Sequence, residues 1–427
     1  MMNDNRAFLF LQGPHGPFFD QLSKMLRQAK AEVWRVGFNA GDAAFWTDKA
    51  SYIRFEGTAE AWPARFAEVL AEKSITDVVL YGDTRPMHAQ AVELARDRGL
   101  TVHVFEEGYM RPYWVTYERG GSNGNSRLMG MSVADMQAEL AQSDGEAPLP
   151  PGHWGDMRQH IFYGALYHWF VMFRNGRYKH FRPHRALEVQ EEFRLYFKRL
   201  MLMPLNAIER LVAQTRIRRG GFPYHVALLQ LEHDASFLEH SPFDSMEDFL
   251  ALVVENFAKG APGHHHLVVK AHPLENGRAP LRRILRRLGE QYALADRLHF
   301  VSGGKLAALL DDARSAVTVN STAGHQVLWR GIPLKTFGSA VYSKPEFVSD
   351  QALADFFAQA TRPDSQAYQH FRRYLLETSQ IPGGFYSSKG RRQLLRHVVD
   401  MMLSADDPYE ALRRGTAAPR QQLRLVN

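Results

Sequence analysis

The sequence predicts an α/β protein with two Rossmann-like domains that face each other across a cleft. Strand-like and helix-like segments alternate up to residue 105 and again after residue 221, and the strands are short, apolar runs of the kind found in parallel sheets. A length of 427 residues also exceeds what one hydrophobic core usually serves.

The first run of elements covers residues 7–105. Strands are expected at 7–11, 33–36, 77–81 (DVVLY) and 101–105 (TVHVF), and helices at 17–30, 58–72 and 85–99. Ligands of doubly wound sheets bind beyond the carboxyl ends of the strands. The segments 12–16, 82–85 and 106–111 are therefore the ones expected to contact a ligand.

A linker and a basic segment follow. Residues 142–152 (QSDGEAPLPPG) have a linker composition, and residues 151–220 hold 13 Lys and Arg against 5 Asp and Glu. This excess of eight exceeds the net charge of +6 of the whole chain, so the segment favours an anionic partner. Its aromatic part, 161–185, fits a core helix with a basic rim or an interfacial helix at lipid headgroups. A single-stranded nucleic-acid surface is disfavoured, because no recognised nucleic-acid fold accompanies it.

The second run of elements begins at Tyr224. Strands are expected at 225–231, 266–272, 298–301, 316–320 and 332–337, and helices at 246–258, 280–288, 305–312 and 322–330. The tail from residue 352 has a helical pattern. We therefore expect an N-terminal domain at 1–150, a helical insertion at 151–220, a nucleotide-binding domain at 221–345 and a helical tail at 346–427 that packs back on the domains.

Composition excludes several classes of protein. The chain has no cysteine, so disulfides, thiolate nucleophiles and Cys-ligated zinc are excluded and a reducing compartment fits. The apolar run 7–11 is too short for a secretory signal, and no stretch approaches the roughly 20 apolar residues of a membrane span. We expect a cytoplasmic protein.

Two motifs are suited to a phosphate. Ser321 and Thr322 lie between a strand and a helix, where hydroxyls and backbone N–H groups can hold an anion, although a simple N-cap explains this motif better when it is taken alone. His272 and Pro273 end another strand, where the histidine could stabilise a leaving phosphate or merely cap a loop.

Carboxylates follow two further strands. Adjacent Glu106 and Glu107 precede Gly108 and are costly to bury unless paired or used, so one could act as acid or base; solvated loop acids are the alternative. Asp234 follows the strand at 225–231 and could act as a nucleophile on an anomeric carbon, or cap a helix.

Two other histidine-bearing segments need an explanation. The turn 12–17 (QGPHGP), with Gly13 and His15, allows a ligand close to the backbone but is neither a dinucleotide fingerprint nor a P-loop. His264–His266 suggests a metal site, yet consecutive strand residues point to alternate faces, so a three-ligand cluster is not expected.

In combination, four segments resemble the capsule polysaccharide biosynthesis family of β-Kdo transferases. They are FEEGYMRPYWVTYE, LLQLEHDASFLEHSPF, VVKAHPLE and VNSTAGHQVLWRGIPLKTFG. QGPHGPFF, VGFNAGD and YGDTRPMHAQAV are similar to its S-type branch. The resemblance covers most of residues 7–345. The chain departs from other Kdo transferases of the family in the long stretch between Gly108 and Asp234.

The resemblance implies a GT-B fold and CMP-Kdo as donor, with no bound metal or cofactor. Glu106, Glu107 and Gly108 match an acidic-glycine motif, His272 and Pro273 an HP motif, and Ser321 and Thr322 a hydroxyl motif; Asp234 matches the Asp of a Q-x-x-x-D segment. Substrate-binding roles are expected for Gly13, His15, Gly108, Arg111, Gln230, Lys270, Pro273, Asn320, Ser321, Thr322 and Gly324.

The family is retaining, which implies two displacements through a glycosyl–carboxylate intermediate. Asp234 would be the nucleophile, one of Glu106 and Glu107 the base, and His272 the stabiliser of the departing CMP phosphate. S-type members are thought to add the first Kdo to a phosphatidylglycerol-type lipid at the inner membrane. A companion C-type Kdo transferase and capsule export proteins are implied partners, and nucleic acid is not.

Two other functions remain open. A related GT-B transferase would use another CMP-sugar or a UDP-sugar, which the phosphate motifs do not distinguish. A non-catalytic scaffold of the capsule assembly complex would be expected to lose at least one acidic or hydroxyl motif position, and this chain has them all.

Overall fold

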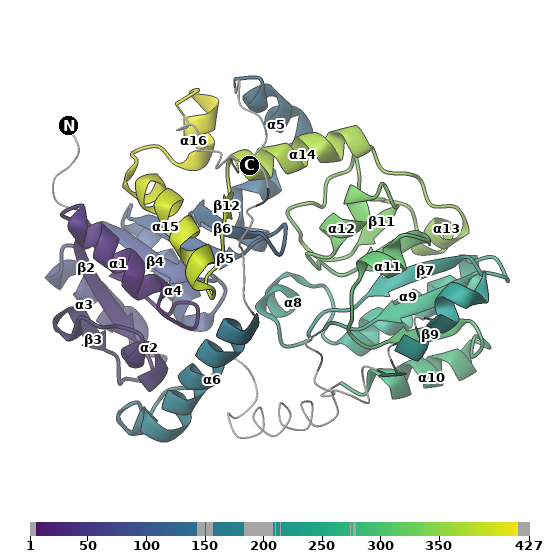
Figure 1. Cartoon of the computed structure of the whole chain (residues 1–427), viewed down its shortest axis with the longest axis horizontal. Coiled ribbons are helices and arrows are strands. Elements are labelled where there is room, and N and C mark those ends of the chain that lie inside the picture. The colour runs from purple at the N-terminus through teal and green to yellow at the C-terminus, as the bar shows by residue number, and fades with distance from the viewer. Residues whose placement is uncertain are drawn as a thin grey trace, which may run out of the picture. The chain divides into compact units, whose positions relative to one another are not determined.

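The computed structural model describes residues 6–142, 150, 157–182, 208–209, 211–213, 215–273, 275 and 279–416 (Figure 1). The chain forms two compact units, which are described separately. The first consists of Met1–His184 and Arg373–Asn427, and the second of Arg185–Arg372. The predicted linker at 142–152 lies largely outside the described residues, and so does part of the predicted helical insertion at 151–220.

The first unit is built on a seven-stranded sheet in the order β12-β6-β5-β4-β1-β2-β3. β1 to β5 run parallel, β6 is antiparallel to β5, and β12 is antiparallel to β6. The strands are β1 Ala7–Phe10, β2 Glu32–Gly37, β3 Tyr52–Arg54, β4 Asp77–Tyr81, β5 Thr101–Glu107, β6 Trp114–Arg119 and β12 Gln380–Pro382. Read as β3-β2-β1-β4-β5, this is the Rossmann order.

Apolar side chains alternate between the two faces of this sheet, and helices cover both. Phe8 and Phe10 point into one core, with α1 and α15, while Leu9 points into the other, with α3 and α4. Figure 1 shows α15 beside α1. The helices are α1 Phe18–Gln28, α2 Ala40–Ala44, α3 Trp62–Glu72, α4 Pro86–Asp97, α5 Val133–Leu140, α6 Met157–Arg174, α15 Ser388–Leu403 and α16 Pro408–Arg413, with short 3-10 turns at Lys49–Ser51, Asn123–Asn125, Arg127–Gly130 and Asn175–Arg177.

The second unit holds a five-stranded parallel sheet in the order β11-β10-β7-β8-β9. Its strands are β7 Tyr224–Leu228, β8 His266–Lys270, β9 Leu298–Val301, β10 Ala313–Thr318 and β11 Leu334–Thr336. Its helices are α8 Ala235–His240, α9 Met246–Gly260, α10 Leu281–Gln291, α11 Ala307–Leu310, α12 Gly324–Trp329 and α13 Leu353–Ala358, and α14 Ser365–Glu377 contains the boundary between the units. The predicted α/β class with two Rossmann-like units is confirmed.

The predicted domain boundaries differ from these units. α6 packs on α2, so it belongs to the first unit and not to a separate insertion. The tail divides: α13 packs on α9 in the second unit, whereas β12 and α15 complete the sheet and the core of the first. Among the described helices, none is long and apolar enough to cross a membrane.

Candidate functional site

In the first unit, a hydrogen bond bridges the point where the strand order reverses. Gln12 follows β1 and Arg85 follows β4, the two neighbouring strands whose connections leave in opposite directions. Nη1 of Arg85 donates to Oε1 of Gln12, with the atoms 2.7 Å apart. Ligands of doubly wound sheets bind at such a point, so Arg85 offers a cation where an anionic ligand is expected.

The adjacent carboxylates lie one strand further along. The sequence predicted a strand at 101–105 with both glutamates in the loop after it. In the structure β5 extends to Glu107, so both glutamates belong to the strand. Burial raises the pKa of Glu106 to about 7; the backbone N–H of Glu107 and the charges of Arg85 and Arg111 act against that rise, and the charge of Glu107 adds to it. A carboxyl group with this pKa can exchange a proton near neutral pH.

Aromatic side chains surround the second carboxylate. Oη of Tyr81 donates to Oε1 of Glu107 at 3.3 Å. The ring of His160, from α6, stacks on Tyr386 with the centroids 3.9 Å apart. Burial lowers the pKa of His160 while the charge of Glu107 opposes that change, which places the imidazole in the field of this carboxylate. The site therefore combines residues from both chain segments of the first unit.

At three positions near the site, a side chain larger than that of glycine would meet neighbouring atoms. A Cβ at Gly82, whose φ is +70°, would lie 3.1 Å from Oε2 of Glu106. A Cβ at Gly13 would lie 2.5 Å from the Phe19 ring, and one at Gly108 would lie 2.1 Å from the carbonyl oxygen of Trp114. Packing therefore accounts for Gly13 and Gly108, for which substrate contacts had been predicted.

The other two predicted residues of the first unit lie at its surface or half-buried. His15 is half-buried and stacks on Tyr167 of α6 at 4.4 Å. Arg111 is exposed, and its charge acts on Glu106. Both are thus part of the same edge of the sheet as the carboxylates.

In the second unit, a reciprocal pair of hydrogen bonds bridges the corresponding point. Gln230 follows β7 and Asn320 follows β10, and both are buried. Nε2 of Gln230 donates to Oδ1 of Asn320 at 2.7 Å, and the backbone N–H of Asn320 donates to Oε1 of Gln230 at 2.9 Å. This pair fixes the start of the loop that carries Ser321 and Thr322.

The hydroxyl loop is half-buried and tightly turned. Oγ of Ser321 accepts from the backbone N–H of Ala323 at 3.2 Å, and its carbonyl oxygen accepts from Oη of Tyr342 at 2.5 Å. A Cβ at Gly324 would lie 2.5 Å from that same Oη. The hydroxyl of Ser321 thus closes a turn before α12, whose N-cap residue is Ala323 and which has no side-chain cap, so the predicted N-cap contact is not made; packing explains Gly324.

Asp234 occupies the N-cap position of α8, but its side chain makes no capping hydrogen bond there. The side chain is exposed. The helix-capping explanation for this residue therefore lacks the contact that defines a cap.

The HP segment follows β8 at the same edge of the sheet. Lys270 is buried at the end of the strand, and its Nζ donates to the carbonyl oxygen of Ala271 at 3.0 Å. His272 is half-buried and Pro273 is exposed. The carboxyl ends of β7, β8 and β10 thus bring Gln230, Asp234, His272 and Ser321 to one edge, as the sequence predicted.

The predicted residues form two sets, one in each unit. Gln12 and Arg85 lie in segments 12–16 and 82–85, which were expected to contact a ligand because ligands bind after parallel strands, but neither was singled out as a site residue. Sequence reasoning missed Tyr81, His160 and Tyr386 as members of the first set.

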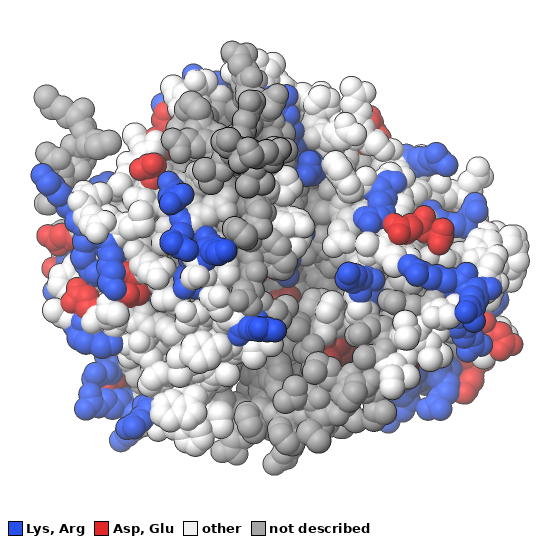
Figure 2. Space-filling model, in the orientation of Figure 1, with Lys and Arg blue, Asp and Glu red and all other residues white. Residues whose placement is uncertain are grey.

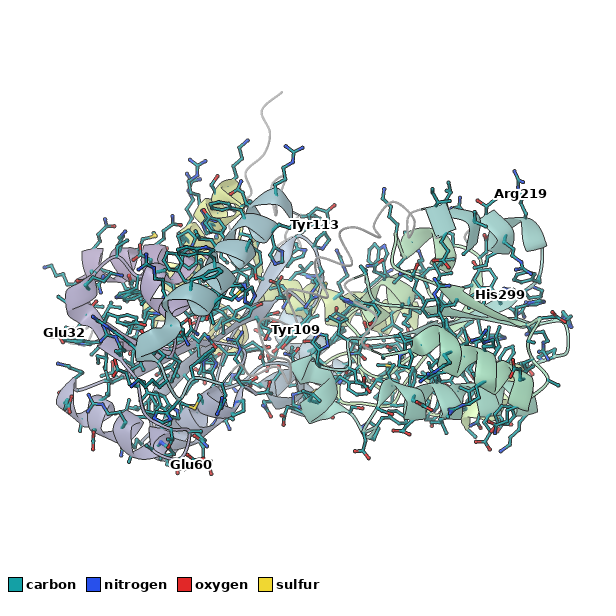
Figure 3. All side chains as sticks on the ribbon, turned by 90° about the horizontal axis from the view of Figure 1, so that it is seen from below. Glu32, Glu60, Tyr109, Tyr113, Arg219 and His299 are labelled. Carbon is teal, nitrogen blue, oxygen red and sulfur yellow. The ribbon has the colours of Figure 1, made fainter. Side chains whose placement is uncertain are left out.

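A histidine cluster lies at the opposite edge of the second sheet. His225 and His265 are joined by a 3.0 Å contact between Nε2 and Nδ1, and His266 and His299 by a 2.9 Å contact between Nδ1 and Nε2. The rings of His266 and His299 also stack on Phe222. Figure 3 labels His299 and Arg219 at the same end of this unit. The run at 264–266 thus forms pairs with neighbouring strands.

The family model and the sequence relatives both describe capsule polysaccharide proteins. A model of the family described as capsule polysaccharide biosynthesis protein matches residues 76–386. The chain is 28% identical to the capsule polysaccharide export protein KpsS of Escherichia coli, over 89% of this chain and 97% of that protein. It is 31% identical to the capsule polysaccharide modification protein LipB of Neisseria meningitidis serogroup B, over 91% of this chain and 93% of that protein. Among solved structures, Thermosulfurimonas dismutans KpsC, a beta Kdo 2,7 transferase, is similar at 12% identity and a TM-score of 0.38, over 86% of this chain and 99% of that one.

Proposed function

This chain belongs to the capsule polysaccharide biosynthesis protein family, and from that premise we propose that it is a retaining β-Kdo glycosyltransferase. Its donor would be CMP-Kdo, and its acceptor a phosphatidylglycerol-type lipid at the inner face of the inner membrane. The product would carry the first Kdo of a capsule linker. The companion C-type transferase and capsule export proteins would act on or beside this product.

One observation carries the proposal. Each of the four motifs that resemble those of β-Kdo transferases lies at or just beyond the carboxyl end of a parallel strand, the edge at which such sheets bind ligands. Glu106 and Glu107 occupy this edge in the first unit; Asp234, His272 and Ser321 occupy it in the second.

The geometry supports a division of labour between the carboxylates. Glu106, with a pKa of about 7, suits the base that takes the proton of the acceptor hydroxyl. Glu107 accepts a hydrogen bond from the Tyr81 hydroxyl, whereas Glu106 accepts one from the backbone N–H of Glu107. Asp234 would attack the anomeric carbon as CMP departs, and the acceptor oxygen would then displace Asp234, with net retention.

The second unit supplies groups for the leaving nucleotide. His272 would stabilise the departing CMP phosphate, while Ser321 and Thr322 hold it. The Gln230–Asn320 pair would keep the hydroxyl loop in place. The proposed scheme assigns no role to a metal or cofactor.

Thermal melting with nucleotides tests the donor class. CMP at about a hundred times its Kd should stabilise the protein by about 2.7 kcal/mol, and UMP at the same concentration should stabilise it less. Stronger stabilisation by UMP would transfer the proposal to a UDP-sugar transferase. No stabilisation by either nucleotide would favour a non-catalytic scaffold.

A further inference from the structure

Helix α6 has two faces with different surroundings. One face packs into the first unit: Oη of Tyr167 accepts hydrogen bonds from Gln12 and Asn39, both at 2.7 Å, and donates to Asp42 at 3.2 Å. Gln12 in turn holds Arg85. This face of the helix is therefore joined to the candidate site by a continuous chain of contacts.

The other face is apolar and exposed. Trp169 and Phe173 lie 7 and 11 residues after Phe162, a spacing that places the three on one side of an α-helix. They are 59%, 45% and 63% exposed, and Ile161 beside them is 64% exposed. Trp169 and Phe173 are in contact, with ring centroids 5.6 Å apart. So large an aromatic face costs free energy in water unless something covers it.

The charge along the segment that contains α6 has one sign. From 157 to 182 the sequence holds five cations and no Asp or Glu: Arg158, Arg174, Arg177, Lys179 and Arg182. All five are exposed. Figure 2 shows an uncharged surface over α6 with Lys and Arg near its ends. Exposed aromatic rings in a segment whose charged side chains are all Arg or Lys are complementary to an anionic lipid surface, where rings enter at headgroup depth and cations meet lipid phosphates.

We propose that α6 docks the first unit on an anionic lipid bilayer, with Phe162, Trp169 and Phe173 inserted at headgroup depth. The benefit of this docking rests on the proposed function, because docking by α6 would bring the edge of the sheet that carries Glu106 to the lipid headgroups of the acceptor. The test of the docking does not rest on that function, since vesicle binding requires no transfer.

Vesicle sedimentation of the full chain tests the docking. The wild type should bind vesicles that contain phosphatidylglycerol and bind weakly to vesicles of phosphatidylcholine alone. The double variant Trp169→Ser, Phe173→Ser should lose binding on the order of tenfold. Trp329→Ser removes another exposed tryptophan, 56% exposed in the second unit, and should bind as wild type does. Arg174→Ala and Arg177→Ala should each weaken binding about fivefold at low salt.

Transfer assays separate the docking from the proposed activity. The double variant should keep wild-type transfer to a water-soluble short-chain phosphatidylglycerol and lose transfer to the same lipid in vesicles. If no variant transfers Kdo to any lipid, the proposed function fails while vesicle binding still tests the docking.

Two results would overturn the docking: wild-type protein that does not bind anionic vesicles, and a double variant that binds them as the wild type does. If the second result came with a change from a wild-type dimer to a monomeric double variant, this face would be assigned to a second copy of the chain. Unchanged melting of the double variant would show that lost binding is not lost folding.

Discussion

The backbone N–H of Glu107 donates a hydrogen bond to Oε1 of Glu106, with nitrogen and oxygen 3.0 Å apart. This bond favours the ionised form of Glu106, whereas burial and the charge of Glu107 oppose it, and the pKa settles at about 7. Transfer should therefore require an ionised Glu106, and kcat/KM should fall about tenfold per pH unit below pH 7. A flat profile between about pH 5 and 8 would contradict this role.

Replacement of the two carboxylates should separate their roles. Glu106→Gln should lower kcat by roughly 10²–10⁴. Glu107→Gln removes a negative charge beside Glu106, so it should retain more activity and move the acidic limb of the profile to lower pH. The reverse pattern would make Glu107 the base.

The pH dependence of the free energy of unfolding should report the same raised pKa of Glu106. The pKa of Glu106 is raised from 4.5 when unfolded to about 7 when folded, so between these values the folded state binds the extra proton. Stability from this group is present below about pH 4.5 and is lost as pH rises through 7. Glu106→Gln should therefore melt higher than the wild type at pH 8 but not at pH 5. An equal difference at both pH values would mean that titration is not its cause.

Arg85 should act on the base through its charge. Because this charge lowers the pKa of Glu106, Arg85→Met should move the acidic limb of kcat/KM to higher pH, and Arg85→Lys should largely restore it. Arg65→Met is a matched control, since Arg65 pairs with Glu68 and Glu72 on the surface of α3. If Arg85→Met lost activity while the acidic limb of the kcat/KM profile stayed at the same pH, Arg85 would act in substrate binding and not on the pKa of Glu106.

The histidine pairs should make the second unit sensitive to acid. Burial lowers the pKa of His225 to about 3 and those of His265 and His299 to about 4, against 6.5 in the unfolded chain. The unfolded chain therefore binds more protons below pH 6.5, and stability should fall as pH drops from about 6.5 towards 4. In the double variant His225→Gln, His299→Gln, the free energy of unfolding measured with urea should depend less steeply on pH. An unchanged slope would locate the acid sensitivity elsewhere.

Asp234 should matter for transfer far more than for folding. Its exposed side chain makes no cap, so Asp234→Ala should change the free energy of unfolding by no more than about 0.5 kcal/mol while abolishing transfer. A structural cap would instead cost about 1 kcal/mol in Asp234→Ala, with Asp234→Asn as stable as the wild type. Chemical denaturation of both variants distinguishes the two.

Local patterns sufficed for most strands of the two sheets. β4 and β9 have the predicted bounds because each is a compact apolar run between polar residues. β12 was missed because its three residues, Gln380–Pro382, lie within a helical pattern and pair with β6, far away in the sequence. The same long-range pairing returns the tail to the first unit, which no local pattern indicates.

The candidate site was predictable to the same degree. Motifs after strands identified Glu106, Asp234, His272 and Ser321, since a strand end fixes which edge a residue occupies. Arg85 resembled an ordinary helix start, and only the fold shows that it meets Gln12, 73 residues earlier. The outer face of α6 was likewise ambiguous, because burial and exposure of aromatic residues look alike in sequence.

Mass spectrometry of one reaction tests the central claim most directly. Purified protein is incubated with CMP-Kdo, generated in situ, and a fluorescent phosphatidylglycerol. We predict a lipid product heavier by one Kdo with the wild type and none with Asp234→Ala. Absence of any product from a wild-type protein that still binds CMP would contradict the lipid acceptor, and absence of both product and CMP binding would contradict the transferase assignment itself.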